Sequence, residues 1–587
     1  MTIITGSYTY YSPTTSAAPA AGTTITVTVT GSFPSGTQFQ YTATYRNTTS
    51  TTTEQYFVAG VGITGSVGPT NFPTTSGTGT FSFTIQYPAT VDPGDGLDVS
   101  LLAPSGVVLG TISFTQPSAT TWNWDGDTSD NWSDGNNWDV GTVPTSTSVV
   151  VIPAGTTYSP VLTGDSVAAS VTVNSGATLD LNGYNLTGVS TFTNNGRIRL
   201  RGTETVGGTK VNGAGSTVQY YGTGGTPVWG ATYQNLTVSS GATLSLTAST
   251  TTVGGNLTVD GALAVGSRTL SVGGNATVSA TGTLSVSTGS ITITGSTTNG
   301  GLIDSSSGSG TQTYGALVTN SGTIRGGSGL ITMNSGITSS GTLEVGSGGA
   351  VVTGNADFTG GTLTLAASAT YNQSSGNLTL GTLNVGANAT VAFTATTDQT
   401  CTTNGQSFVN LSISGGTDTT TVVGALNVTG TLSIGSNQTL NIGSNDFSIV
   451  TLSNDGTVRL TGTGASTHTI TTMDTDSGLV VYYGSGSPTI YDFGTTDYYN
   501  LEIDGTGAFT ASTALGVANS LTITNSGGVT FSDTLSASSV HIAGTAAGQT
   551  ITFAGDLTAT SFTTAAGGYN IELNTGTGGQ TSSITNA

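Results

Sequence analysis

The chain has 587 residues, of which 89 are glycine, and its 8 basic and 29 acidic residues give a formal net charge of -21. Nucleic acids and anionic membrane surfaces are bound through many cationic side chains, so we expect neither as a partner. Val, Leu, Ile and Ala recur among Thr, Ser, Gly and Asn. This mixture favours strands and turns over helices, and no apolar run is long enough to predict membrane insertion.

Polar and apolar residues alternate in short segments of residues 1–117, among them 24–30, 38–45 and 80–87. Such alternation buries one face of a strand, and about six or seven strands of this kind predict a small immunoglobulin-like β-sandwich. The first segment, residues 2–11, precedes a linker rich in Pro and Ala. We interpret it as a possible donor strand that pairs with another copy of the chain. The alternative is that it completes its own sandwich.

Residues 118–155 contain four of the five tryptophans of the chain and five aspartates. Aromatic rings can cover the open end of a solenoid, so we expect this segment to be a junction and a cap. Closely spaced carboxylates also suit Ca²⁺, which makes Asp125, Asp127 and Asp130 the candidate metal ligands and calcium the candidate cofactor. The spacing departs from an EF-hand loop, and none is predicted.

A motif of the form Gly-x-apolar-x-apolar repeats through residues 156–587. From Gly241 to Gly381 it recurs at intervals of 20, 21, 19, 21, 19, 20 and 20 residues. One period contains three short apolar-polar-apolar segments, 257–259, 263–265 and 270–272, bounded by turn-forming residues. Three strands and three corners close one coil, so the pattern predicts a parallel β-helix of about 20 residues per coil. Because parallel crossovers are right-handed, we expect a right-handed helix.

Longer units also recur. The segment TVQYYGTGGTPVWGATYQNLTVSSGATLSL (217–246) is echoed by VVYYGSGSPTIYDFGTTDYYNLEIDGTGAF (480–509) and more weakly by residues 391–415. These units, the phrase LDLNGYNLTGVSTFTNNGRIRL (179–200) and the NW repeats of the junction resemble the repeats of large bacterial β-helical adhesins and surface-layer proteins. The resemblance implies an extracellular, cell-surface setting and does not identify a ligand.

Many β-helices are polysaccharide lyases or hydrolases, and a hydrolase needs two carboxylates about 5–10 Å apart. The nearest candidate here is Asp474 with Asp476, close in sequence to His468, although such a pair is also typical of a solvated turn. The one cysteine, Cys401, lacks the basic partner that a nucleophilic thiol needs. We therefore expect that the chain is not an enzyme and has no catalytic residues.

Asn-x-Ser/Thr sequons are numerous, and Asn235, Asn256 and Asn275 are spaced by 21 and 19 residues. Glycosylation is one interpretation. The spacing favours another, in which these asparagines occupy one corner of successive coils, because Asn tolerates turn geometry and forms side-chain ladders.

Together these features predict an extracellular structural protein, a subunit of a surface layer, sheath or filament that assembles with other copies of itself. The alternative is an adhesin, or a glycan-binding stalk or fibre, whose partner is a cell-surface glycan. A polysaccharide lyase or hydrolase is the least favoured class.

Overall fold

The computed structural model describes residues 2–5, 8–11, 24–31, 39–46, 56–58, 61–63, 66–71, 79–86, 96–103, 106–115, 121–464, 467–565, 567–573 and 583–584. Within these residues the chain is all-β, apart from one 3₁₀ turn, η1 (Gly135–Asn137). No helix of the described residues is long and apolar enough to span a membrane. The chain forms two compact units. The first contains residues 1–123, 138–151 and 167–171, and the second contains the rest.

Two four-stranded antiparallel sheets make up most of the first unit. Alternation along one strand buries Tyr41, Ala43 and Tyr45, as the period of two predicted. The immunoglobulin-like character of this unit stays a prediction. In the order of their pairing, the strands are β10 (Val108–Thr115), β9 (Gly96–Leu102), β4 (Gln40–Arg46) and β7 (Ser66–Asn71) in one sheet, and β3 (Thr24–Gly31), β8 (Gly79–Gln86), β5 (Tyr56–Val58) and β6 (Val61–Ile63) in the other.

Residues 2–11 contain two strands where the sequence predicted one. These are β1 (Thr2–Thr5) and β2 (Tyr8–Tyr11), which pair with each other in antiparallel register. The Gly6-Ser7 dipeptide between them has the composition that two-residue hairpin turns favour, a signal that the single-strand prediction overlooked. Donation to another copy stays a prediction, and the donated element would be a hairpin.

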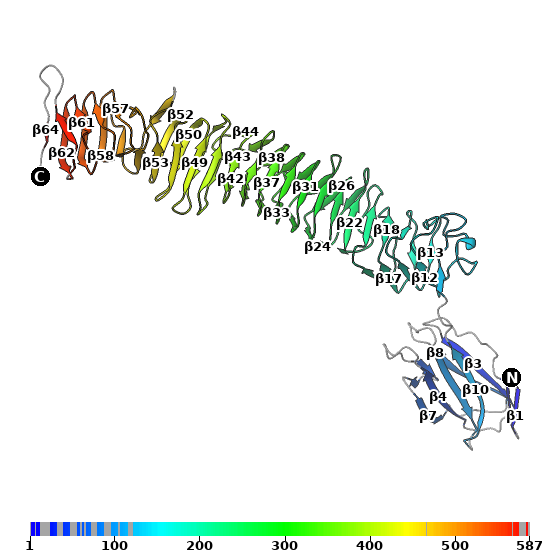
Figure 1. The fold of residues 1–587 in the computed structure, drawn as a ribbon. Helices are drawn as coiled ribbons and strands as arrows, with labels where there is room; N and C mark the ends of the chain where they lie inside the picture. Colours follow the sequence, from blue (N-terminus) through cyan, green and yellow to red (C-terminus); the bar gives the residue numbers. More distant parts are fainter. Residues whose placement is uncertain are drawn as a thin grey trace. The chain divides into compact units, whose positions relative to one another are not determined.

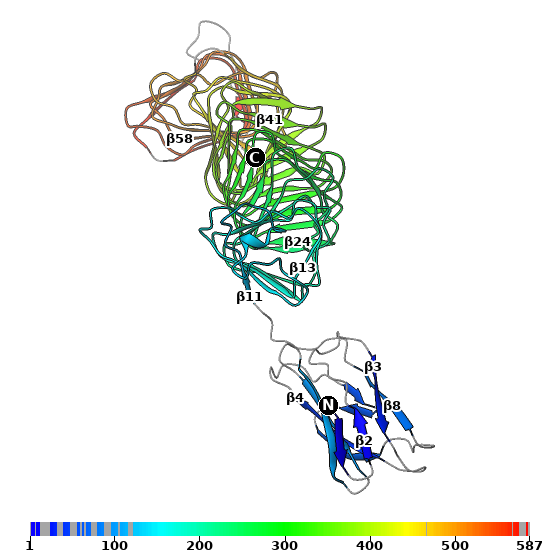
Figure 2. The same cartoon turned by 90° about the vertical axis from the view of Figure 1, so that its right-hand side faces the viewer.

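The second unit is a parallel β-solenoid of about 21 turns with about 20 residues per turn. Figures 1 and 2 show the coils stacked in chain order, from cyan to red. The parallel β-helix that the glycine spacing predicted is therefore confirmed, and its right hand stays a prediction. The principal sheets have 21 strands, from β15 (Thr178–Asp180) to β64 (Ser583–Ile584), 14 strands, from β21 (Thr232–Tyr233) to β54 (His468–Thr472), and 8 strands, from β23 (Thr243–Ser245) to β44 (Thr382–Val385).

One coil shows how the aliphatic core forms. Leu257, Leu263 and Leu270 lie first or second in three short strands, and all three are fully buried. Each strand pairs in parallel with a strand of the next coil, so the buried side chains stack into columns. The strands of this coil are β25 (Leu257–Val259), β26 (Ala262–Gly266) and β27 (Thr269–Val272), with the register Leu257 to Ala276, Leu263 to Leu284 and Leu270 to Ile291.

The repeating glycines mark a corner where successive coils approach too closely for a side chain. A Cβ on Gly282 would collide with the carbonyl oxygen of Val259, and one on Gly322 would collide with the carbonyl oxygen of Gly301. Close backbone approach therefore explains the glycines that repeat from Gly261 to Gly381, whereas Gly241 has a positive φ of 74° and open space around it.

An asparagine ladder occupies another corner. The Oδ1 of Asn235 accepts the N–H of Asn256 at 2.8 Å, and the Oδ1 of Asn256 accepts the N–H of Asn275 at 2.9 Å. Asn275 accepts the N–H of Ser296 at 3.0 Å in the same way. The prediction that these sequons share one corner of successive coils is confirmed.

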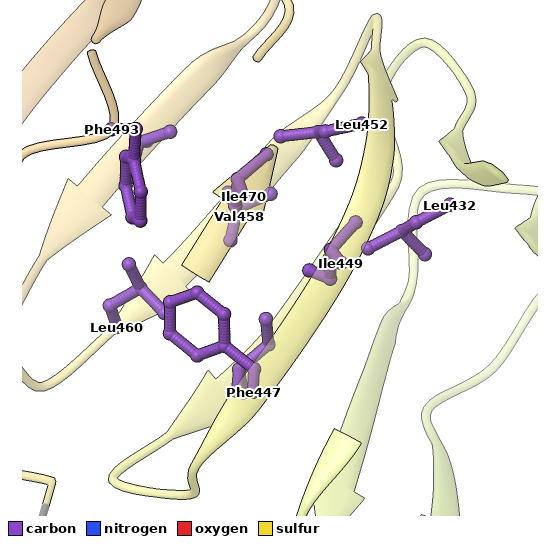
Figure 3. Close-up of a pocket in the computed structure, with 10 residues that line it drawn as sticks. Leu432, Phe447, Ile449, Leu452, Val458, Leu460, Ile470 and Phe493 are labelled. Carbon is purple, nitrogen blue, oxygen red and sulfur yellow. The ribbon is translucent and has the colours of Figure 1, made fainter. Parts of the chain in front are cut away.

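The sheets that make up the coils change between residues 472 and 509. The 14-stranded sheet ends at β54, and a four-stranded sheet from β57 (Phe509–Ala511) to β63 (Asn570–Leu573) belongs to the last coils. A small cavity lies at this change, and its labelled lining side chains are all apolar (Figure 3). We interpret it as a packing defect of the core. Its lining residues are Leu432, Ile442, Phe447, Ile449, Leu452, Val458, Leu460, Ile470, Val480 and Phe493.

We predict that Leu263→Asp disrupts the solenoid locally. Leu263 lies in a column between Leu244 and Leu284, and an unpaired carboxylate there costs several kcal/mol. Ala264→Asp, on the neighbouring half-exposed position, is the matched control and should change little. Thermal melting followed by circular dichroism measures both. Equal melting temperatures for Leu263→Asp and the unaltered chain would contradict the register.

Candidate functional site

The tryptophan-rich segment forms the layer that precedes the first coil of the second unit. Asn131 pairs in parallel with Val161, and Val161 pairs in parallel with Asp180 in β15. The N–H of Trp132 donates to the carbonyl of Val161 at 3.0 Å. Residues 124–137 thus stand where a cap of the solenoid is expected.

Buried side chains hold the loop of this layer in place. Trp124 and Trp132 are fully buried, and the indole N–H of Trp124 donates to the carbonyl of Tyr158 at 2.7 Å. The side chain of Asn137 is also fully buried, and its Oδ1 accepts the N–H of Ser129 at 2.9 Å. The tryptophans therefore pack as core, and the loop that bears the aspartates is fixed from inside.

Two of the three predicted calcium ligands border one surface hollow. Asp125 and Asp127 line it together with Trp124 and residues 153–157, and Asp130 is not part of that lining. Within the described residues, no group of three or more His, Cys, Asp or Glu side chains is placed to hold a metal. Calcium at Asp125, Asp127 and Asp130 stays a prediction.

The first of the two long sequence echoes forms a tyrosine unit inside the coil. The hydroxyls of Tyr220 and Tyr233 lie 3.3 Å apart, and their rings meet edge to face at 6.5 Å between centroids. The N–H of Trp229 donates to the Tyr220 hydroxyl at 3.1 Å, and the Tyr233 hydroxyl donates to the carbonyl of Gly230 at 2.7 Å. Burial raises the pKa of Tyr233 to about 12. Both phenols therefore stay neutral and fasten the loop.

The second echo has the same geometry. The hydroxyls of Tyr482 and Tyr498 lie 2.9 Å apart, with their rings edge to face at 6.3 Å. The N–H of Tyr491 donates to the Tyr482 hydroxyl at 3.0 Å. Burial raises the pKa of Tyr482 above its ordinary value. The repeated sequence is thus a repeated structure, with Tyr491 in the place of Trp229.

A charged cluster lies on the outer face of the first tyrosine unit, on β18 (Arg197–Leu200) and its neighbouring strands. Figure 1 labels β18. Arg199 lies over the ring of Tyr221 at 4.7 Å, and its Nη1 is 2.8 Å from Asp180 Oδ2. The Tyr221 hydroxyl donates to Asp180 Oδ1 at 2.8 Å. One carboxylate therefore neutralises the guanidinium and accepts the phenol.

The matching cluster on β53 (Thr457–Leu460) has an amide in place of the carboxylate. Arg459 lies over the ring of Tyr483 at 4.7 Å, the same distance as in the first cluster. The Tyr483 hydroxyl donates to Asn441 Oδ1 at 2.8 Å. The stacking of the arginine and the hydrogen bond of the phenol are therefore repeated, and among the described residues no carboxylate forms an ion pair with Arg459.

Two buried carboxylates bind backbone N–H groups. Glu204 accepts N–H groups of residues 183 and 201–203 at 2.6–3.0 Å. Asp497 accepts the N–H groups of Phe493, Gly494 and Gly516 at 2.5–2.9 Å. Burial outweighs these hydrogen bonds and raises the pKa of Asp497 to about 6. Sequence reasoning missed both residues, because the N–H groups that they bind converge only in the fold.

Asp474 and Asp476, the catalytic candidates from the sequence, make contacts separate from those of His468. Asp474 Oδ1 accepts the N–H of Asp476 at 3.1 Å, so the two aspartates form a turn. The ring of His468 stacks on Tyr491 at 4.1 Å, and its Nε2 lies 3.8 Å from Asp446 Oδ1. Burial lowers the pKa of His468. The contacts recorded for His468 are therefore with Asp446 and aromatic rings, and the aspartate pair follows the turn interpretation.

Cys401 is an interior residue of the stack. Its side chain is fully buried between Leu378 and Val422, its partners in register. Burial raises the pKa of the thiol to about 12, so it stays protonated at neutral pH. A thiol of this kind packs as a small apolar group.

The comparisons with known proteins give one match. A family model described as a domain of unknown function (DUF8693) matches residues 123–219. No curated protein and no solved structure matches the chain. The matched residues contain the tryptophan-rich layer and the first coils, including Asp180 and Arg199.

We predict weak calcium binding at the hollow of the tryptophan-rich layer. Paired carboxylates in extracellular modules hold Ca²⁺ with Kd of about 10⁻⁴–10⁻³ M. Isothermal titration calorimetry with CaCl₂ should detect binding that Asp125→Asn with Asp127→Asn removes. Asp130→Asn tests the third predicted ligand. No heat of binding, together with identical melting in chelator, would remove the metal.

We also predict that Asp497 makes stability depend on pH. Its pKa of about 6 lies above the value of about 3.9 in an unfolded chain, so folding favours its protonated form. Its stabilising contribution is complete below pH ~3.9 and is lost as the pH rises through ~6. Asp497→Asn should flatten the fall in melting temperature between pH 4 and 7. The exposed control Asp533→Asn should keep it. An unchanged slope in Asp497→Asn contradicts the assignment.

Proposed function

We propose that the chain is an extracellular structural protein, the subunit of a surface layer, sheath or filament built from copies of itself. The observation that carries the proposal is the 21-stranded parallel sheet, which joins every coil from β15 to β64. At about 4.8 Å per strand such a stack is roughly 100 Å long. A hydrogen-bonded rod of this length offers a long, regular surface along which copies of the chain can pack.

The use of charge in the solenoid supports the same function. Glu204 and Asp497 bind backbone N–H groups of their own loops. Arg325 pairs with Glu344 on the adjacent strand at 2.6 Å, in direct register. These ionisable groups stabilise the coils, which is the role expected of them in a structural protein.

The outer rows support close packing between copies. Thr258, Thr277 and Thr298 follow one another in register on the outer face of the large sheet. Uncharged rows of this kind offer hydroxyl groups and little repulsion to a neighbouring rod. The resemblance to bacterial surface-layer repeats supports the extracellular setting.

A second candidate is a glycan-binding stalk or adhesin. A surface hollow at the first tyrosine unit is lined by Lys210, Asn212, Trp229, Tyr233 and Gln234, among others. Amide, ammonium and aromatic groups around a concavity are the groups that bind sugars. This hollow favours glycan binding at one place on the rod, whereas the continuous sheet favours assembly along all of it.

Negative-stain electron microscopy of the purified chain tests the proposal. We predict ordered sheets or filaments at concentrations where a monomeric stalk would show separate rods. Because the chain carries a net charge of -21, assembly should strengthen when salt screens the repulsion between copies. Separate rods under all salt conditions would contradict the structural function and favour the stalk.

A further inference from the structure

The two outer clusters differ in the residue opposite the arginine. Asp180 neutralises Arg199 in the first cluster, and Asn441 holds the equivalent place beside Arg459 in the second. Strand register confirms the equivalence, since Asp180 is opposite Arg199 and Asn441 is opposite Arg459 on adjacent parallel strands. Opposite the arginine, the second cluster therefore has an amide where the first has a carboxylate.

The second cluster also lacks the groups that cover the tyrosine of the first. In the first, Arg201 lies 5.7 Å from the ring centroid of Tyr221 and donates to Asn182 Oδ1 at 2.8 Å. In the second cluster Gly443 stands at the position of Asn182, two residues after Asn441, and it shares the positive φ of Asn182 (66° against 51°). Thr461 stands at the position of Arg201, two residues after Arg459. Neither replacement has a long polar side chain, so the second tyrosine lacks the counterparts of the Arg201 and Asn182 side chains.

The guanidinium of Arg459 has no acidic partner in the described part of the chain. No ion pair involves it there, and the next acid of its outer row is Glu502, two strands on. Glu502 is about 9.6 Å away between backbones, and no ion pair joins it to Arg459 among the described residues. Glu502 accepts a hydrogen bond from the Thr524 hydroxyl at 2.6 Å. Arg459 is thus held over a ring, half-exposed and not neutralised.

We propose that Arg459, with Asn441 and Tyr483, is a contact site for an Asp or Glu carboxylate of a second copy of the chain. The incoming carboxylate binds the half-exposed guanidinium of Arg459 beside Asn441, through paired N–H groups of the planar guanidinium. This proposal rests on the self-assembly proposed above and names one of its contacts.

Two observations favour a second copy as the occupant. Each chain carries 29 acidic and only 8 basic residues, so carboxylates are abundant in an assembly and unpaired guanidinium groups are scarce. Arg459 lies on the outer face of the large sheet, between the buried Val458 and Leu460. A sheet face matches another rod along its length, and the contact is repeated in every subunit.

The test uses two variants, each of which removes the unpaired positive charge at Arg459. Asn441→Asp places an internal carboxylate opposite Arg459, as Asp180 is placed opposite Arg199, whereas Arg459→Gln removes the guanidinium. Both should raise the critical concentration for assembly, measured by sedimentation of the full chain, by about tenfold or more. Asn441→Asp should keep or raise the melting temperature, because it adds an ion pair. Arg268→Gln, at an exposed arginine of another corner, should assemble like the unaltered chain.

The outcomes separate the contact from the function. If the unaltered chain assembles and both variants match it, this site is overturned while the structural function stands. If the unaltered chain does not assemble, the structural function is overturned, and the contact site that rests on it is overturned as well. If assembly is unchanged but the variants lose binding to oligogalacturonate, measured by calorimetry, the occupant is an acidic glycan and the second-copy assignment is overturned.

Discussion

The parallel hydrogen-bond ladder between successive coils is the constraint on which the rest of the structure depends. It places each residue beside its counterpart about 20 residues later, so a buried leucine stacks on a buried leucine and an outer threonine on an outer threonine. Corners must then be shared by all coils, which restricts one corner to glycine and gives another to an asparagine ladder. Fold and surface pattern both follow from one repeated register.

This register explains how much the sequence alone could predict. The coil, its three strands and the asparagine corner were all visible because a stacked repeat leaves a period in the sequence. The hairpin of residues 2–11 was missed because one Gly-Ser pair was not taken as a turn. The backbone contacts of Asp497 and the stacking of His468 on Tyr491 were not predictable, because they join loops whose approach depends on the fold. Asp180, Arg199 and Tyr221 are each about one coil apart in the sequence. Their contacts nevertheless become visible only when the strand register places them side by side.

The duplicated tyrosine units show how a solenoid varies its surface while keeping its core. Their strands β20 (Thr217–Tyr220) and β55 (Leu479–Tyr482) belong to the same sheet, and their interior hydroxyl pairs are alike. The outer clusters differ in the residue opposite the arginine, because an outward residue can change without disturbing the column behind it. A structural protein gains distinct contact sites along one rod in this way.

The most direct test of the account is a distance between coils far apart in sequence. Thr237 and Thr338 lie on the outer row of the large sheet, five strand spacings apart, so spin labels there should be about 24 Å apart. Double electron–electron resonance measures this distance, and the buried, protonated Cys401 should not take up the label. The stacked register predicts one narrow distribution near that value. A broad distribution, or a centre displaced by two strand spacings or more, would contradict it.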